Sequence, residues 1–184
     1  MSTTVQLHDL YFVPYIEEAK IQQRVLELGA ALATKFADKQ PIFLAILNGS
    51  YVFAADLMRA CEFDHEVTFI KLTSYEGTKT TGRITTQIGL KENLADRHVI
   101  IVEDIIDTGT TIHHFLPTLK KEKPASTSII SFLSKPDALK FPLKIDYIGF
   151  EIPNKFVVGY GLDYNGLGRN LKSIYQLSDD KKMT

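Results

Sequence analysis

The sequence contains one cysteine, no apolar run long enough to cross a bilayer and almost no net charge. The single Cys61 excludes an intramolecular disulfide, and we expect an inert thiol in the core. The longest apolar runs, PIFLAIL and HVIIV, are much shorter than the roughly 18 residues that a membrane-spanning helix needs. The first residues, MSTTVQLHDL, lack a basic segment followed by an apolar one. These absences predict a soluble protein of the cytoplasm.

The net charge of -1 at pH 7 arises from acidic and basic residues spread along the chain. Such a balance gives no general attraction to nucleic acid or to a membrane surface, so we expect neither as a partner. A polyanionic ligand would then need local groups or a metal to hold it. The 184 residues, 45% hydrophobic and 23% charged, show no internal repeat and no Ser-, Gly- or Pro-rich linker. We therefore predict a single domain over residues 1–184.

Apolar spacing predicts the first elements of the fold. Between residues 16 and 36, apolar side chains recur every three or four positions, which is typical of one face of an amphipathic helix. PIFLAIL, at residues 41–47, is typical of a buried strand. A tight turn follows, in which Ser50 is a candidate N-cap for a helix over residues 51–60.

The rest of the chain continues this alternation. Further strand-like segments lie at residues 67–75, 98–106, 126–133, 144–152 and 155–161. A helix is expected after Gly109, in which Pro117 predicts a kink or a helix end nearby. Residues 76–89 are polar without a clear period, which is typical of a lid loop, with a pair of short β-arms as the alternative. Alternating strands and helices predict an α/β fold with a doubly wound, mostly parallel sheet flanked by helices.

The segment IVEDIIDTGTT, at residues 101–111, is unusual for a buried strand. It contains three carboxylates, one glycine and three threonines within nine positions. Adjacent Glu103 and Asp104 are costly to bury unless they are paired, bound to a metal or kept at the rim of a cleft. A strand that leads into DTGTT and then a helix gathers N–H groups and hydroxyls around one concavity suited to phosphate. The carboxylates would then bind sugar hydroxyls, hold a divalent metal or move a proton.

The same segment has a simpler interpretation, in which Asp107 or Thr108 caps a helix and the acidic pair is solvated at a strand end. The glycine spacing of a dinucleotide fingerprint and the pattern GxxxxGK[ST] are both absent, so those two phosphate cradles are excluded. Adjacent His113 and His114 would point about 100 degrees apart on a helix, so they cannot share a metal ion.

VEDIIDTGTT resembles the phosphoribosyl-diphosphate signature of type I phosphoribosyltransferases. The rest of the chain resembles the hypoxanthine-guanine phosphoribosyltransferases of purine salvage. The similarity covers five blocks in order: LNGSYVFAADL, LTSYEGTKTTG, IVEDIIDTGTT, FLSKP and DYIGFEIPNKFVVGYGLDYNGLGRN. The resemblance implies the type I phosphoribosyltransferase fold, with a core over about residues 14–135 and a small hood formed from about residues 1–13 and 136–184.

The resemblance also implies an activity. A 5-phosphoribosyl group would pass from phosphoribosyl diphosphate to hypoxanthine, guanine or both, forming IMP or GMP and pyrophosphate with Mg2+ as cofactor. Two alternatives stay open: a non-catalytic regulatory protein that senses nucleotides through the same fold, and a paralogue that prefers xanthine. The resemblance further implies a homodimer or homotetramer.

By resemblance, the signature supplies most of the site. Glu103 and Asp104 would bind the 2′ and 3′ hydroxyls of the ribose and take part in holding Mg2+. The loop that would wrap the 5′-phosphate comprises Asp107, Thr108, Gly109, Thr110 and Thr111. Asp107 would also face purine N7 as a general acid or base. Lys135 would donate to the 6-oxo group, where an exocyclic amine would be left unpaired.

The C-terminal blocks imply the remaining contacts with the two substrates. Phe156 would stack on the purine base, and the backbone of Val157 would read its edge. Asp163 is similar to the family's aspartate that holds a second Mg2+, and Arg169 to the arginine that reaches the pyrophosphate.

Two further blocks resemble parts of the family's site. Ser74 and Tyr75 are similar to the pair that begins the family's flexible loop, which would cover the site. Asn48 and Gly49 occupy the pyrophosphate-binding turn, which in the family often contains a non-proline cis peptide bond before this position. The family usually has lysine where this chain has Asn48. The asparagine keeps amide donors but loses the positive charge, which puts pyrophosphate affinity, subunit contacts or both in question.

Overall fold

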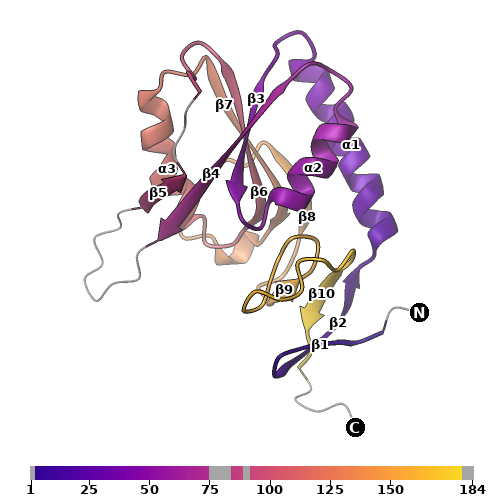
Figure 1. Ribbon diagram of the computed structural model, residues 1–184. Helices are drawn as coiled ribbons and strands as arrows, with labels where there is room; N and C mark the ends of the chain where they lie inside the picture. Colours follow the sequence, from indigo (N-terminus) through magenta and orange to yellow (C-terminus); the bar gives the residue numbers. More distant parts are fainter. Residues whose placement is uncertain (1–2, 75–83, 89–91, 180–184) are drawn as a thin grey trace.

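The computed structural model describes residues 3–74, 84–88 and 92–179 (Figure 1). Its main part is a six-stranded sheet with the strand order β5-β4-β3-β6-β7-β8. The strands are β3 (Ile42–Leu47), β4 (Glu66–Ser74), β5 (Ile84–Ile88), β6 (His98–Ile106), β7 (Ser126–Ser134) and β8 (Tyr147–Glu151). Neighbouring strands are parallel except for β4 and β5, which are antiparallel. The predicted mostly parallel sheet is confirmed.

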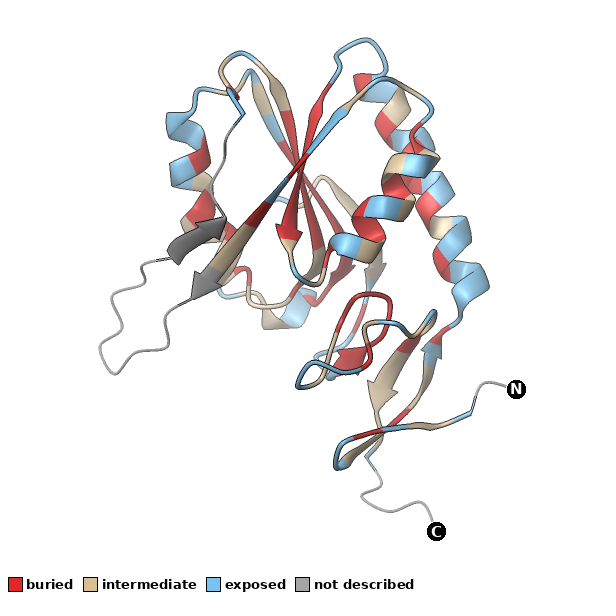
Figure 2. Cartoon of the chain, in the orientation of Figure 1, coloured by how far each residue is buried: buried red, intermediate tan, exposed pale blue. Residues whose placement is uncertain are grey.

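Helices cover both faces of this sheet. α1 (Glu18–Phe36) and α2 (Tyr51–Ala60) lie on one face, and α3 (Thr110–Lys121) lies on the other (Figure 1). A short 3-10 helix, η1 (Pro136–Ala138), follows β7. Figure 2 shows buried residues concentrated along the central strands, as expected for a parallel sheet covered on both sides. None of the helices in the described part of the chain is long and apolar enough to cross a membrane.

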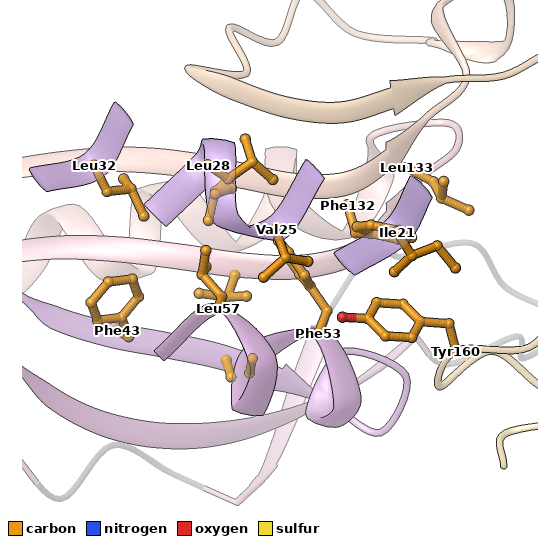
Figure 3. Close-up of a cluster of buried hydrophobic side chains, with 14 of the residues drawn as sticks. Ile21, Val25, Leu28, Leu32, Phe43, Phe53, Leu57, Phe132, Leu133 and Tyr160 are labelled. Atoms are coloured by element: carbon orange, nitrogen blue, oxygen red, sulfur yellow. The ribbon is translucent and has the colours of Figure 1, made fainter. Parts of the chain in front are cut away.

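The apolar stripe of α1 builds the core on its side of the sheet. Its buried side chains, spaced as the sequence predicted, are Ile21, Val25, Leu28, Leu32 and Phe36. They pack in one cluster with Phe53 of α2 and Phe132 of β7, whose ring centroids lie 5.1 Å apart (Figure 3). Cys61 belongs to the same cluster, and burial raises the pKa of its thiol to about 12. The predicted core position of this thiol is confirmed.

A second, four-stranded antiparallel sheet forms from the two ends of the described chain. Its strands, in spatial order, are β1 (Val5–Leu7), β2 (Leu10–Ile16), β10 (Ile174–Leu177) and β9 (Val157–Val158). This small sheet is the hood that the resemblance implied. The boundaries at about residues 14 and 135 stay a prediction, and β8, which lies beyond residue 135, pairs with β7 of the large sheet.

Several local predictions can be compared with the structure. Ser50 is the N-cap residue of α2, as predicted, but its backbone is already helical and its hydroxyl donates to the Ile46 carbonyl at 2.5 Å, so it makes no side-chain capping bond. Pro117 lies inside α3, which continues on both sides of it. Within the predicted lid loop, residues 84–88 form β5, in agreement with the β-arm alternative. The rest of that loop lies outside the described residues.

Gly29→Ala should destabilise the protein, although alanine is the better helix former. A Cβ at Gly29 would lie 2.5 Å from the Ala60 carbonyl oxygen, where α1 meets the end of α2. Alanine is favoured over glycine in a helix by about 1 kcal/mol, whereas overpacking costs about 1–3 kcal/mol. We expect urea denaturation to show a net loss of about 1 kcal/mol in the free energy of unfolding.

Ala30→Gly is the matched control because Ala30 is the next residue of α1 and is exposed. It should lose about 1 kcal/mol through helix propensity alone. If Gly29→Ala instead stabilised the protein by about 1 kcal/mol, as helix propensity alone predicts, the close contact between the two helices would be refuted.

Candidate active site

Three neighbouring parallel strands, β3, β6 and β7, end at the same edge of the large sheet. Asn48 directly follows β3, Asp107 follows β6 and Lys135 follows β7. Ligands of open α/β sheets bind beyond the carboxyl ends of such strands. The small sheet lies beyond this edge in Figure 1, so predicted site residues from three separate parts of the chain emerge opposite the hood.

The loop over residues 107–111 leads from β6 into α3 and includes the first two residues of that helix, Thr110 and Thr111. Gly109, with a φ of 72°, is the residue before the helix, and glycine adopts this left-handed conformation without strain. The hydroxyl oxygens of Thr108 and Thr110 are 2.8 Å apart, and the loop lines a cavity of about 100 Å³ together with Glu103. The first N–H groups of a helix lack intrahelical partners, so this end of α3 can bind an anion such as phosphate.

The alternative in which Asp107 or Thr108 caps α3 is wrong. The capping position is occupied by Gly109, which has no side chain. The Thr108 hydroxyl lies 2.8 Å from the Thr110 hydroxyl and accepts a long, 3.4 Å bond from the Thr110 N–H, but Thr108 precedes the capping position by one residue. The left-handed glycine turns the chain at this point, so the helix begins after the side chains that could have capped it.

The segment after β7 supports this loop. The Lys135 N–H donates to the Ile106 carbonyl at 2.9 Å, and the Lys140 N–H donates to the Thr108 carbonyl at 3.0 Å. Because both bonds join backbone groups, the position of the loop is tied to that of Lys135.

Lys135 and Asp107 form an ion pair across adjacent strand ends. The Lys135 ammonium lies 2.7 Å from Asp107 Oδ2. The lysine side chain is 7% exposed and the aspartate side chain 45% exposed, so a buried cation is paired with a carboxylate that also faces outward. A buried ammonium needs such a partner because its desolvation is costly. The pair presents a hydrogen-bond donor and a proton acceptor side by side.

Glu103 and Asp104 form an acidic pair at the end of β6. Glu103 is buried, and this burial, together with the charge of Asp104, raises the pKa of Glu103 well above its usual range. Burial also raises the pKa of Asp104, although hydrogen bonds and the positive charge of Arg169 oppose this effect. The pair therefore resists carrying two negative charges. A protonated Glu103 could donate a hydrogen bond as well as accept one.

Two glycines let separate segments approach closely beside Asp104. The peptide bond between Leu47 and Asn48 is cis, as the resemblance implied, and Gly49 follows it. A Cβ at Gly49 would overlap Asp104 Oδ2. Gly161, with a φ of 100°, faces the Gly49 carbonyl so closely that a Cβ there would overlap its oxygen. No side chain larger than hydrogen fits at either position.

Arg169 is held at this point by two bonds. Its Nη2 lies 2.6 Å from Asp163 Oδ1, and its Nη1 donates to the Gly161 carbonyl at 2.7 Å. Asp163 Oδ2 in turn accepts the Gly166 N–H at 2.7 Å. The positive charge of Arg169 partly opposes the rise that burial causes in the pKa of Asp104, which places the guanidinium near the acidic pair. Asp163, Arg169 and Asp104 therefore lie on the same side of the site.

Phe156 presents an aromatic ring at the hood. The residue is 43% exposed, and its ring packs against Phe12 and Tyr164 with centroid distances of 6.1 and 5.9 Å. Val157, the next residue, is buried in β9 and pairs with Gln176 of β10. A half-exposed ring supported by two others can stack on a planar ligand.

Some predicted site residues are not assembled or cannot be placed. Among the residues that the structure describes, no group of three or more His, Cys, Asp or Glu side chains is placed to share a metal ion, so Glu103, Asp104 and Asp163 form no common cluster. Ser74 ends β4, and only its backbone is described, whereas Tyr75 lies outside the described residues.

Reasoning from the sequence missed Gly161 and Lys140 as parts of the site's framework. The GYG run at residues 159–161 was a usable signal for Gly161, because closely spaced glycines often mark backbone turns with positive φ. Lys140 contributes only its backbone N–H, so nothing in its side chain could have identified it.

A parallel sheet whose strand ends carry a phosphate-sized loop beside charged side chains is typical of α/β proteins that bind phosphorylated ligands. The family model described as the phosphoribosyl transferase domain matches residues 17–165. The chain belongs to this phosphoribosyltransferase family.

Two relatives and one solved structure are similar over nearly the whole chain. The hypoxanthine-guanine-xanthine phosphoribosyltransferase of Tritrichomonas foetus is 39% identical over 175 residues, which cover 95% of each chain. The hypoxanthine-guanine phosphoribosyltransferase of Bacillus subtilis (strain 168) is 38% identical over 168 residues, covering 91% of this chain and 93% of the relative. A crystal structure of a hypoxanthine phosphoribosyltransferase from Staphylococcus aureus has a TM-score of 0.87 and 36% identity, covering 92% of each chain.

Gly49→Ala should weaken the fold through its contact with Asp104. An added Cβ would overlap the Asp104 carboxylate, so this half-buried side chain would have to shift against its buried neighbour Glu103. We expect the free energy of unfolding to fall by about 1–3 kcal/mol, the usual cost of overpacking, in a denaturant titration.

An Asp104→Ala background provides the control, because it removes the overlapping atoms. The effect of Gly49→Ala should then shrink to within about 0.5 kcal/mol of zero, so the two substitutions are strongly coupled. An equal loss in both backgrounds would contradict the close approach of Gly49 to Asp104.

Proposed function

We propose that this protein is a purine-salvage phosphoribosyltransferase that moves a 5-phosphoribosyl group from phosphoribosyl diphosphate to hypoxanthine or guanine. The products would be IMP or GMP and pyrophosphate. The observation that carries the proposal is the 2.7 Å pair of Lys135 and Asp107 directly beside the phosphate-sized loop of α3. The names of the Tritrichomonas foetus and Bacillus subtilis relatives support the same reaction.

The ion pair explains the choice of base in this proposal. A 6-oxopurine presents O6 and N7 as neighbouring acceptors on one edge. The Lys135 ammonium would donate to O6, and Asp107 would face N7 and take up or return its proton. Adenine places an amino group where O6 stands, and an ammonium cannot accept a hydrogen bond from it. The half-exposed ring of Phe156 would stack on the base, and the backbone of Val157 would read its edge.

The donor would bind on the other side of the same strand ends. The loop over residues 107–111 and the first turn of α3 would surround the 5′-phosphate. Glu103 and Asp104 would bind the two ribose hydroxyls, which can both donate and accept hydrogen bonds. Asn48, Gly49 and Arg169 would face the diphosphate. Asn48 offers an amide instead of a positive charge, so in this proposal the guanidinium of Arg169 would supply positive charge for that group.

The carboxylates near Arg169 fit a Mg2+ ion that arrives with the donor. Mg2+ is usually held by one or two carboxylates together with phosphate oxygens and water, and it does not require a cluster of protein ligands. Asp163 and Asp104 would supply such carboxylates, and Glu103, as the more deeply buried acid, would contribute least. When bound, the ion neutralises charge on the leaving pyrophosphate.

The reaction requires stabilisation of a cation rather than a strong nucleophile. Departure of pyrophosphate leaves an oxocarbenium-like ribose, as in glycoside hydrolysis. The ionised member of the Glu103–Asp104 pair would lie beside this ribose, and Arg169 would remain with the departing pyrophosphate. Asp107 would accept a proton from the purine as the new glycosidic bond forms.

The regulatory alternative is not favoured, because the groups required for chemistry, Asp107, Lys135 and Arg169, are present and paired. Xanthine is a further candidate base, since the name of the Tritrichomonas foetus relative includes it. We also propose that the protein acts in the cytoplasm as a homodimer or homotetramer, which light scattering on the purified protein would test.

An absorbance assay tests the proposed function. The purified protein would receive phosphoribosyl diphosphate, Mg2+ and one base at a time, chosen from hypoxanthine, guanine, xanthine and adenine. We expect turnover of hypoxanthine or guanine that stops on addition of EDTA, and no turnover of adenine. If no base were converted but nucleotide still bound in a calorimeter, the regulatory alternative would replace the enzyme.

Asp107→Asn should reduce kcat by about 100-fold while the KM for phosphoribosyl diphosphate changes little, because general acid–base groups contribute about 100-fold or more. The amide keeps the size of the side chain but cannot accept the purine proton. Steady-state kinetics would show the effect. Asp137→Asn, an exposed aspartate in η1, is the control and should be neutral. Equal activity of Asp107→Asn and wild type would remove Asp107 from catalysis.

Lys135→Ala should relax the preference for a 6-oxo group. The ratio of kcat/KM for hypoxanthine to that for adenine should fall by at least about tenfold, the discrimination expected from one hydrogen bond to a charged donor. Lys140→Ala provides the control, because Lys140 is an exposed lysine of the same segment that supports the loop only through its backbone. An unchanged ratio in Lys135→Ala would exclude Lys135 as the reader of the 6-oxo group.

A further inference from the structure

Tyr160 is a buried phenol that the proposed reaction does not use. The residue is 3% exposed, and its ring packs on Phe132 with the centroids 4.7 Å apart (Figure 3). Its hydroxyl donates to Asp56 Oδ2 at 2.8 Å. Burial, followed by the bond to Asp56, raises the pKa of Tyr160, so the hydroxyl remains a donor.

Asp56 of α2 holds this hydroxyl as part of a small network. The aspartate side chain is 12% exposed and also pairs with Arg59, one turn further along α2. Gln22 of α1 donates to the same Oδ2 atom at 3.3 Å. The bond between the Tyr160 hydroxyl and Asp56 is short and largely shielded from water, because the Tyr160 ring and the Asp56 side chain are both mostly buried. The Tyr160–Asp56 bond is therefore a firm link between α2 and the C-terminal part of the chain.

This link joins the two segments that form the diphosphate end of the proposed site. α2 begins shortly after the Asn48–Gly49 turn. Gly161, next to Tyr160, lies against the Gly49 carbonyl, and its N–H donates to the Arg169 carbonyl at 3.1 Å. The Arg169 guanidinium returns a bond to the Gly161 carbonyl. A shift of Tyr160 relative to α2 would therefore move Arg169 relative to the Asn48–Gly49 turn.

We propose that Tyr160 and Asp56 are positioning residues that set the spacing between Arg169 and the Asn48–Gly49 turn. This spacing would determine the affinity for the diphosphate group of the donor, so the proposal rests on the proposed function. A diphosphate that is bound by Arg169 on one side and by the turn on the other is sensitive to the distance between these two contacts. The groups that would bind the base are held by other contacts. Lys135 and Asp107 stand at the ends of β7 and β6, whereas Phe156 packs on Phe12 and Val157 pairs with β10 inside the hood.

Tyr160→Phe tests the proposal because it keeps the ring and removes only the hydroxyl. The KM for phosphoribosyl diphosphate should rise about tenfold, the order expected when a hydrogen bond to a charged group is lost. The KM for hypoxanthine should change less than about twofold, because uncoupled sites behave independently. Asp56→Ala should reproduce the effect, and the double variant should be no worse than either single one.

Two further variants distinguish positioning from a general structural role. Asp56→Asn keeps an oxygen that can accept the Tyr160 hydroxyl, so it should restore most of the donor affinity lost in Asp56→Ala. Tyr175→Phe is the control, since it also removes a single phenol hydroxyl, from a tyrosine that pairs with Val158 in the hood strand β10. Tyr175 is assigned no role in the proposed site, so the KM for phosphoribosyl diphosphate should stay at the wild-type value.

Equal increases in both KM values for Tyr160→Phe, or no increase in either, would overturn the proposal. The proposal would also be overturned if Tyr160→Phe lowered kcat without changing either KM and lowered the unfolding temperature as well, because that result would indicate a general structural role. Failure of the wild-type protein to convert any base would count against the proposed function and not against the link. Calorimetry with inorganic pyrophosphate and Mg2+ then decides: tenfold weaker binding by Tyr160→Phe supports the proposal, whereas equal binding, or no binding by wild type, refutes it.

Discussion

Burial of the central sheet on both faces is the constraint on which the rest of the structure depends. Strands β3, β6 and β7 have helices on both sides, so their middle positions hold apolar residues and a charged group there would lose its hydration. Charged side chains are instead found where the strands end. The Lys135–Asp107 pair lies just beyond the ends of β7 and β6, and the Glu103–Asp104 pair lies in the last four residues of β6, next to this edge.

Close backbone packing then fixes the hood against this edge. Gly49 meets the Asp104 carboxylate, and Gly161 meets the Gly49 carbonyl, so three distant parts of the sequence share one small volume. Because neither glycine leaves room for a Cβ, the arrangement is rigid in the way that a packed core is rigid. Arg169 takes its position from the same contact, through its bonds to Gly161 and Asp163.

Those elements that have a strong period or a dense motif could be predicted from the sequence. β6 covers residues 98–106 as predicted, and α1 buries the predicted stripe, because burial on one or both faces imposes a regular apolar pattern. The hood strands β1 and β10 were missed since strands of three and four residues are too short to show alternation, whereas β9 lies within the strand predicted at residues 155–161. The Tyr160–Asp56 bond spans 104 positions, and local patterns carry no information about such a pair.

The Lys135–Asp107 pair shows why a motif can identify a site without revealing which side chains interact there. Asp107 lies in a recognisable signature, but its partner comes from the end of the next strand, 28 positions away. An ammonium has three donors, so Lys135 can keep its bond to Asp107 and still donate to a ligand oxygen. In the proposed reaction the lysine would thus orient the carboxylate while it donates to the base. Parallel pairing of β6 with β7 creates this geometry, which neither strand possesses alone.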